Sequence, residues 1–184
     1  MSEILDRLNA DHRNMSRLLE LLEREYALLA GNGAPDIALM RDAMHYLTHY
    51  SDRFHHPVED RIFDRAQDEL PSMRELVGRL RREHYQLAED GRALYQVLLE
   101  VESDVAVRRD VLRTLVDHYV RSQRAHMDLE EGKLFPLARR ELDPNWWARL
   151  AEEVDAGRDP LFGHLLDQEY RYLRAALESP AGEV

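Results

Sequence analysis

The sequence contains no cysteine. This absence excludes disulfides, zinc–thiolate sites, iron–sulfur clusters and thiol nucleophiles. The chain also lacks an apolar run of about 18 residues, so we predict no transmembrane helix. Its first residues, Met-Ser-Glu-Ile-Leu-Asp, contain neither the basic region nor the apolar region of a signal peptide. We therefore expect a cytoplasmic protein.

Positive charge is also scarce. The chain has 25 Lys and Arg against 36 Asp and Glu, which gives a net charge of −11. This balance argues against nucleic acid and anionic membranes as main partners. With 184 residues, 44% of them hydrophobic and 33% charged, the chain fits one domain of a soluble helical protein.

Two segments place a histidine four residues before a glutamate. His55 precedes Glu59, and His126 precedes Glu130. On a helix this spacing puts both side chains on one face, about 6 Å apart. An imidazole and a carboxylate one turn apart form a two-point clamp for a metal ion.

The two clamps belong to an internal repeat. They are separated by 71 residues, and two further histidines, His12 and His84, are separated by 72 residues. Each half of the chain therefore supplies a histidine and then a His–Glu clamp at nearly the same spacing. We interpret this pattern as a duplication of one helical hairpin.

Apolar residues at alternating spacings of three and four predict four long helices. His12 and His84 lie in the apolar seams of the first and third helices, where leucine would be expected. Short loops between the helices favour an all-α, up-down-up-down four-helix bundle. The four predicted helices span residues 3–30, 37–69, 72–102 and 104–141.

Helix ends and irregularities also have sequence signals. We predict Asp36 and Asp104 as N-caps, and a capping box formed by Ser72 with Glu75. Pro57 falls inside the second helix, where it should cause a kink or bulge. The seam glycine Gly91 would let a neighbouring helix approach closely.

After the four helices, two shorter ones are predicted at 144–156 and 160–178, forming an extension packed on the bundle. Asp143-Pro144 and Asp159-Pro160 each place a capping side chain before a proline. The aromatic residues of this part suggest packing onto the bundle: Trp146, Trp147, Phe162, Tyr170 and Tyr172. We expect a frayed tail at 179–184. The predicted domain boundaries are 1–143 for the bundle and 144–184 for the extension.

Taken together, the histidines and glutamates of the repeat indicate a metal-binding site. Burying two carboxylates without a cation costs several kcal/mol each. In an antiparallel bundle the four repeat-related positions meet at one level, so each of two metals would take two histidines and share the glutamates. Histidine and carboxylate ligands point to non-haem iron, with manganese or zinc possible. The chain has no Glu-x-x-His pair, which the ferritin-like di-metal bundle requires.

Some ligand positions stay open at this point. His56 could replace His55 if a bulge at Pro57 rotates the turn, and Glu131 could replace Glu130. Other polar residues are weaker candidates. His45 and His49 lie one turn apart without an acidic partner in register, and His118 and His164 also lack a ligand pattern. Tyr119, two turns before His126, either borders an open metal position or belongs to the core.

The chain resembles the hemerythrin-like, HHE-type cation-binding domains. The resemblance covers residues 3–141 and is sharpest in Asp-His-Arg-Asn-Met, Phe-His-His-Pro-Val-Glu-Asp-Arg-Ile-Phe, Arg-Glu-His and His-Met-Asp-Leu-Glu-Glu-Gly-Lys-Leu-Phe-Pro. It implies a four-helix bundle around an oxo- or hydroxo-bridged di-iron centre that reacts with dioxygen, peroxide or nitric oxide. Carried over residue by residue, the implied iron ligands are His12, His55, Glu59, His84, His126 and Glu130.

One position departs from the oxygen carriers of that family. They have a further histidine one turn after the third-helix histidine, where this chain has Ala88. The remaining ligand set looks more like iron–sulfur repair proteins and an iron-sensing F-box domain, although this chain lacks the cysteine-containing segment of the repair proteins. We therefore expect reaction with a small oxidant in a stress response. The alternatives are a sensor that acts through a protein partner and a bundle that metal merely stabilises.

Overall fold

The structure is a computed structural model, and it describes residues 3–31, 33–154 and 159–178. These residues are almost entirely helical, and no strand occurs among them. The helical elements are, in chain order, α1 (Glu3–Ala30), α2 (Ile37–Tyr50), η1 (Ser51–His55), α3 (His56–Glu69), η2 (Pro71–Met73), α4 (Arg74–Glu102), α5 (Arg109–Leu129), η3 (Glu130–Leu134), α6 (Phe135–Glu141), α7 (Pro144–Glu153), η4 (Gln168–Tyr170) and α8 (Arg171–Glu178).

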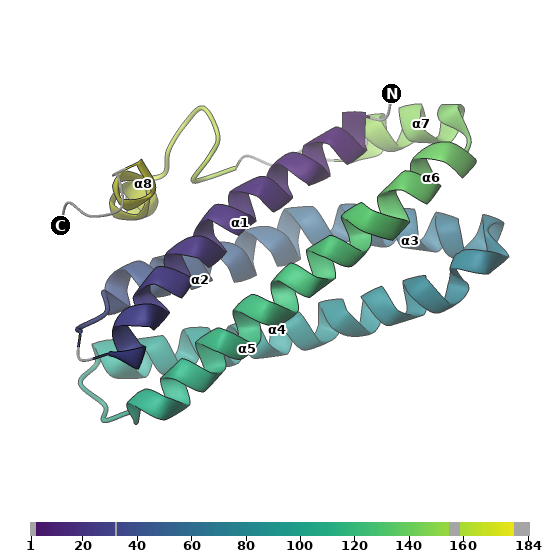
Figure 1. The fold of residues 1–184 in the computed structure, drawn as a ribbon. Helices are drawn as coiled ribbons and strands as arrows, with labels where there is room; N and C mark the ends of the chain where they lie inside the picture. Colours follow the sequence, from purple (N-terminus) through teal and green to yellow (C-terminus); the bar gives the residue numbers. More distant parts are fainter. Residues whose placement is uncertain (1–2, 32, 155–158, 179–184) are drawn as a thin grey trace.

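The long helical segments lie side by side as a bundle (Figure 1). Helix α1 packs against α2 and α5, and α4 packs against α2, α3 and α5. A Cβ added to Gly91 of α4 would lie 2.8 Å from Thr48 Cγ2 of α2, so the predicted close approach at this glycine is confirmed. None of the helices in the described ranges is long and apolar enough to cross a membrane.

Two hydrophobic clusters fill the bundle, one toward each end. The first contains Met15 and Leu87, and the second contains Leu8 and Leu80. Buried polar side chains lie between the two clusters. On α1, for example, His12 lies about one turn after Leu8 of the second cluster and about one turn before Met15 of the first. The packed clusters thus enclose a polar layer from both ends, and this layer contains the residues of the metal hypothesis.

Two π turns interrupt the long helices next to that layer. In η1 the His56 N–H donates to the Ser51 carbonyl, and Pro57 follows. In η3 the Phe135 N–H donates to the Glu130 carbonyl, and Pro136 follows. Proline has no N–H to continue the α-helical ladder, so a wider turn accommodates it. The predicted bulge at Pro57 is confirmed, and the turn before Pro136 carries the same sequence signal.

The helix ends confirm one N-cap and correct another. Asp36 caps α2, because its Oδ1 accepts a hydrogen bond from the Leu39 N–H at 2.9 Å. The capping box of Ser72 with Glu75 is wrong. A 3₁₀ turn begins at Pro71, so Ser72 lies inside a helical turn, and α4 starts without a side-chain cap.

The prediction that Asp104 caps the fourth helix is also wrong. Helix α5 starts at Arg109, and Asp104 instead ends α4 with a left-handed φ of 60°. Its N–H donates to the Val101 carbonyl, and the Val105 N–H donates to the Glu100 carbonyl at 2.9 Å. This pair of bonds is the Schellman C-terminal motif, with aspartate in the position that glycine usually takes.

The chain after α6 differs from its predicted helices. Helix α7 is confirmed with its Asp143 cap, which accepts from the Asn145 N–H at 2.8 Å, while residues 155 and 156 lie outside the described ranges, as does the tail at 179–184. The single helix predicted at 160–178 is wrong. Its first part is a loop closed by a hydrogen bond from the Asp167 N–H to the Pro160 carbonyl, and helix resumes only at η4 and α8.

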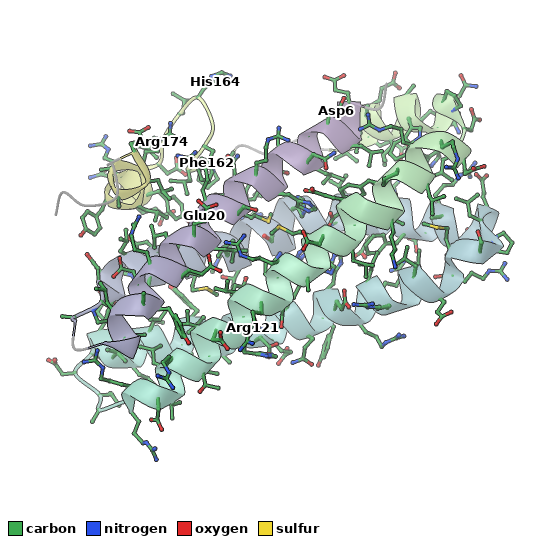
Figure 2. All side chains as sticks on the ribbon, in the orientation of Figure 1. Asp6, Glu20, Arg121, Phe162, His164 and Arg174 are labelled. Atoms are coloured by element: carbon green, nitrogen blue, oxygen red, sulfur yellow. The ribbon has the colours of Figure 1, made fainter. Side chains whose placement is uncertain are left out.

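The predicted packing of the aromatic residues holds for most of them. Trp147 and Tyr170 are buried, Trp146 and Phe162 pack against the hydrophobic clusters, and Tyr172 is exposed. Figure 2 shows Phe162 on the C-terminal loop beside α1, near Arg174 of α8.

Candidate metal centre

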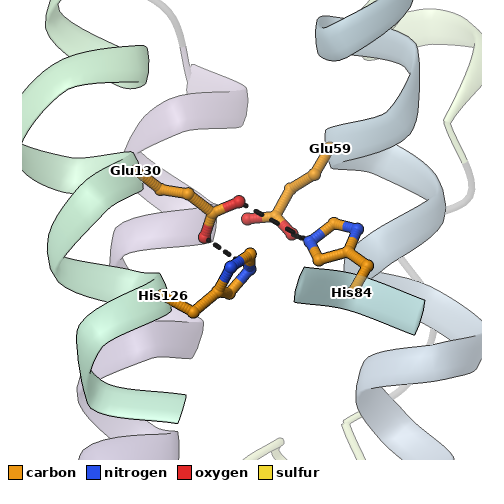
Figure 3. Close-up of side chains that lie close together, drawn as sticks. All are labelled: Glu59, His84, His126 and Glu130. Atoms are coloured by element: carbon orange, nitrogen blue, oxygen red, sulfur yellow. Dashed lines mark ion pairs between the residues drawn. The ribbon is translucent and has the colours of Figure 1, made fainter. Parts of the chain in front are cut away.

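The six predicted ligand residues lie together in the polar layer, and we call them the six-residue cluster. They come from α1, η1, α3, α4, α5 and η3. All six are buried, and Glu59 and Glu130 have no exposed surface. Figure 3 shows four of them, with Glu59 and Glu130 facing His84 and His126.

Glu59 divides its two oxygens between two groups of histidines. Its Oε1 lies 3.0 Å from His55 Nε2 and 3.5 Å from His12 Nε2. Its Oε2 lies 3.3 Å from His84 Nε2. Two potential metal-binding groups therefore share this carboxylate: one with His12 and His55, the other with His84, His126 and Glu130.

Glu130 also spans both groups. Its Oε1 lies 3.6 Å from His84 Nε2, and its Oε2 lies 3.4 Å from His126 Nε2 and 3.5 Å from His12 Nε2. Donor atoms bound to one ion at about 2.1 Å lie about 3 Å from each other. The separations within the cluster are close to this value, so the donors are spaced as ligands of shared ions would be.

The donor atoms themselves show that the cluster fits a metal. Both oxygens of Glu59 and of Glu130 are buried without a hydrogen bond, and so are Nε2 of His84 and Nε2 of His126. Buried polar atoms almost always have a partner, and an unpaired carboxylate in a protein interior is costly. A cation bound among these atoms would satisfy them together.

Positive charge on three histidines, His12, His55 and His84, is favoured in the metal-free protein. Burial alone disfavours the charged form of His12, but the hydrogen bond to Glu131 and the negative charge of Glu59, 3.5 Å away, outweigh burial and raise its pKa to about 10. His84 behaves in the same way, since Asp60 and the cluster glutamates outweigh burial and raise its pKa. The cluster therefore attracts cationic charge, which protons supply when no metal does.

The other members divide between charged and neutral forms. Burial and the nearby Glu59 raise the pKa of Glu130 to about 7. The pKa of Glu59 is lowered, because His55 and its other histidine neighbours outweigh burial. Burial and the charge of His84 lower the pKa of His126 to about 3, so His126 is a neutral imidazole with Nε2 free to bind a metal.

A second ring of carboxylates holds the outer nitrogens of the histidines. His12 Nδ1 lies 2.9 Å from Glu131 and His55 Nδ1 lies 3.1 Å from Asp11. His126 Nδ1 is 3.1 Å from Glu83. His84 Nδ1 is 3.7 Å from Asp60, which is an ion-pair contact and too long for a hydrogen bond. A carboxylate that accepts from Nδ1–H fixes the tautomer and leaves Nε2 for the metal. We call Asp11, Asp60, Glu83 and Glu131 the outer carboxylates.

Our reading of the sequence missed three of the outer carboxylates and considered the fourth, Glu131, only as an alternative metal ligand, although the repeat contains a signal for all four. Glu83 follows Asp11 by 72 residues and Glu131 follows Asp60 by 71, the spacings of the repeat itself. Each outer carboxylate is the chain neighbour of one cluster residue but contacts another. The pairs Asp60–His84 and Glu131–His12 join the two halves of the chain.

We expect Glu83→Ala to weaken metal binding by about 10–100-fold, because His126 loses the carboxylate that orients it. The matched control is Glu89→Ala. Both glutamates lie on α4 and pair with an arginine of that helix, Glu83 with Arg79 and Glu89 with Arg92, but only Glu83 contacts a cluster histidine. Competition with a chelator measures the affinity. Equal affinities in the two variants would contradict the role of the outer carboxylates.

The structure also places the alternative ligands. His55, not His56, points into the cluster; His56 stacks on the His84 ring and its Nδ1 faces Asp52 at 3.2 Å. Glu131 reaches only the outer nitrogen of His12.

The weaker candidates lie elsewhere. Tyr119 is buried in the hydrophobic cluster of Met15 and Leu87, which is the core position. His45 contacts Tyr170, His118 pairs with Asp90, and His49 and His164 are exposed. Figure 2 shows His164 at the tip of the C-terminal loop, away from the bundle.

Comparison with known proteins gives one result. The family model of the hemerythrin HHE cation binding domain matches residues 3–138, which include the whole six-residue cluster. No curated protein and no solved structure gives a match.

Proposed function

The chain belongs to the hemerythrin HHE cation-binding family, and we propose that it is a non-haem di-iron protein that reacts with a small oxidant. The observation that carries this proposal is the pair of buried histidine–carboxylate groups that share Glu59. His12 and His55 would hold one iron, His84 and His126 would hold the other, and Glu59 and Glu130 would be shared by both. Nitrogen and carboxylate donors without thiolate suit iron, and they leave manganese and zinc as alternatives.

The proposed architecture follows the same assignment. We take the four long helical segments as an up-down-up-down four-helix bundle, formed by residues 1–143, with residues 144–184 as an extension. The packing of α1 against α5 and of α2 against α4 supports this arrangement. We also propose that the protein acts in the cytoplasm. A chain without cysteine forms no disulfides, so it needs no oxidising compartment.

The protein's own residues prepare the site in two ways. Three of the outer carboxylates accept hydrogen bonds from His12, His55 and His126, which orients these imidazoles so that each Nε2 is directed toward the cluster. The hydrophobic clusters at both ends exclude bulk water, which strengthens every electrostatic interaction between them. A bound iron pair would supply redox chemistry with dioxygen, peroxide or nitric oxide.

Ala88 distinguishes reaction from carriage in this proposal. It lies one turn after His84 on α4, half-buried, and its methyl group offers no donor atom. Because alanine stands where the oxygen carriers have a further histidine, one more coordination position of the iron would be open to water or an oxidant. We therefore propose oxidation of the centre, in an oxidative or nitrosative stress response, instead of reversible oxygen carriage.

Anaerobic loading with ferrous iron tests the proposal. We expect about two irons per chain and, after dioxygen or peroxide is added, near-ultraviolet charge-transfer absorption of ferric iron. The oxidised protein should not release dioxygen under argon. Fewer than about 0.5 iron per chain would contradict the assignment. A long-lived adduct that bleaches under argon would instead show a carrier, and tightly held, unreactive zinc would show a structural role.

A further inference from the structure

A row of buried tyrosines leads from the six-residue cluster toward the surface. Tyr50, Tyr46 and Tyr170 are 4%, 1% and 3% exposed, and we call them the tyrosine row. The row begins beside His55, because the Tyr50 hydroxyl donates to Asp11 Oδ1 at 3.4 Å while Asp11 Oδ2 lies 3.1 Å from His55 Nδ1.

The rings of the row are in contact. The centroids of Tyr50 and Tyr46 are 5.0 Å apart, with the rings within 10° of parallel. The centroids of Tyr46 and Tyr170 are 5.9 Å apart, edge to face. These are ordinary separations for interacting aromatic pairs, so the three rings form an unbroken series of contacts.

Every hydroxyl of the row is hydrogen-bonded to a carboxylate or an imidazole. Tyr50 donates to Asp11, Tyr46 donates to Asp159 at 3.1 Å, and the Tyr170 hydroxyl lies 2.7 Å from His45 Nδ1. Burial raises the pKa of each of the three phenols, so they stay protonated. A buried phenol loses an electron most readily when its proton can move to a bonded base in the same step. Phenylalanine would fill the same space, so packing alone does not explain the three bonded hydroxyls.

The far end of the row reaches a surface pocket. A cavity of about 420 Å³ is lined by Arg41, Asp42, His45, Tyr95, Leu99, Glu169 and Tyr170. Its volume suits a small polar molecule. Tyr170 and Asp159 belong to the C-terminal segment, which lies outside the residues that match the family model. The outer half of the row is therefore a feature of this chain's own extension.

We propose that the tyrosine row carries single electrons from a small one-electron reductant in this pocket to the metal centre. The inference rests on the proposed function, because only a redox-active centre needs the electrons. It also gives the C-terminal segment a role, since that segment supplies Tyr170 and the base for Tyr46.

Each transfer is balanced in electrons and protons. Tyr50 gives one electron to the oxidised centre, and its phenol proton moves to Asp11, which leaves a neutral tyrosyl radical. Tyr46 returns an electron to Tyr50 as the proton comes back from Asp11, and its own proton moves to Asp159. Tyr170 restores Tyr46 in the same way, with His45 as its base. The reductant restores Tyr170, so the net change is one electron lost by the reductant and one gained by the centre.

The test compares Tyr46→Phe with Tyr119→Phe in the iron-loaded protein. Tyr119 is a matched control, because it is equally buried but shows no hydrogen bond to a base within the described ranges. Peroxide oxidises the ferrous protein in the presence of ascorbate, and the loss of ascorbate is followed by absorption. We expect ascorbate oxidation to slow by about tenfold or more in Tyr46→Phe and in Tyr170→Phe, with iron content unchanged, and not to slow in Tyr119→Phe.

A second readout follows the radical itself. Peroxide added to ferrous protein without reductant should give a tyrosyl radical in freeze-quenched electron paramagnetic resonance, with a lower yield in Tyr46→Phe. Wild-type rates of ascorbate oxidation in both row variants, with the iron still oxidised by peroxide, would overturn the relay. Failure of the proposed function gives a different result, because peroxide would then not oxidise the iron of the wild type.

Discussion

Glu59→Ala is expected to lose most of the bound metal from both halves of the centre. Glu59 belongs to both potential metal-binding groups, and each of its oxygens faces a different set of histidines. Loss of a residue that merely orients a ligand costs about 10–100-fold in affinity, so removal of a shared ligand should cost at least about 100-fold. Metal analysis after gel filtration measures the retained ions.

Glu130→Ala should also lose most of the metal, because its oxygens contact histidines of both groups. The controls are His45→Ala and His164→Ala, which remove imidazoles that lie outside the cluster and should keep the wild-type metal content. Far-ultraviolet circular dichroism distinguishes metal loss from unfolding. If both glutamate variants kept their metal, the buried face would have been assigned to the wrong function.

The helices and the cluster were predictable from the sequence for a physical reason. A period of 3.6 residues fixes which side chains share a helix face, so a histidine and a glutamate four residues apart must project together. The duplication then relates His12 to His84 without any knowledge of packing. These two regularities are local or repeated, and the structure accordingly places all six residues in one buried cluster.

The errors concern helix ends, where several arrangements compete for the same side chain. Asp104 fits an N-cap in sequence, but the chain uses it in a left-handed turn that ends α4. Asp159 does accept hydrogen bonds from the N–H groups of Leu161 and Phe162, as a cap would. Its other oxygen accepts from Tyr46, and the loop then closes through Asp167 before helix resumes.

Contacts between side chains of different helices could not be predicted from the spacing of residues in the sequence. The pairing of Asp60 with His84 joins residues 24 positions apart on different helices, and that of Tyr46 with Asp159 joins residues 113 apart. Which carboxylate reaches which nitrogen depends on how the helices rotate and bulge, as at η1 and η3. The repeat indicates the outer carboxylates only once the contacts are known.

Metal removal should destabilise the protein, and more so at alkaline pH. In the metal-free protein the pKa of His12 is raised from 6.5 to about 10, and that of His84 is also raised. A raised pKa contributes stability that is fully present below the unfolded value of 6.5 and lost as the pH rises through the folded value. Glu130 acts in the same direction, because its pKa is raised from 4.5 to about 7. Near neutral pH, bound protons thus stabilise the metal-free cluster by offsetting the charge of its buried carboxylates. These protons dissociate as the pH rises.

A bound metal replaces these protons, so the metal-loaded protein should keep its stability at alkaline pH. An uncompensated buried charge costs about 3–5 kcal/mol, and 1 kcal/mol shifts Tm by about 2–4 °C at this length. We therefore expect metal to raise Tm by roughly 6–20 °C at about pH 9 and by less at about pH 6. Calorimetry of both forms at both pH values measures the difference. Below about pH 6 the metal itself should dissociate as protons compete for the histidines.

The double variant Glu59→Gln with Glu130→Gln is the matched control, because it keeps the side-chain shapes and removes both buried carboxylates. Without these carboxylates the pKa values of the histidines should be raised less. The Tm of the metal-free variant should therefore fall less than that of the wild type between about pH 6 and about pH 9. The variant should also bind little metal. A metal-free wild type whose Tm equals that of the loaded form at both pH values would show that the buried carboxylates are balanced by something other than protons or metal.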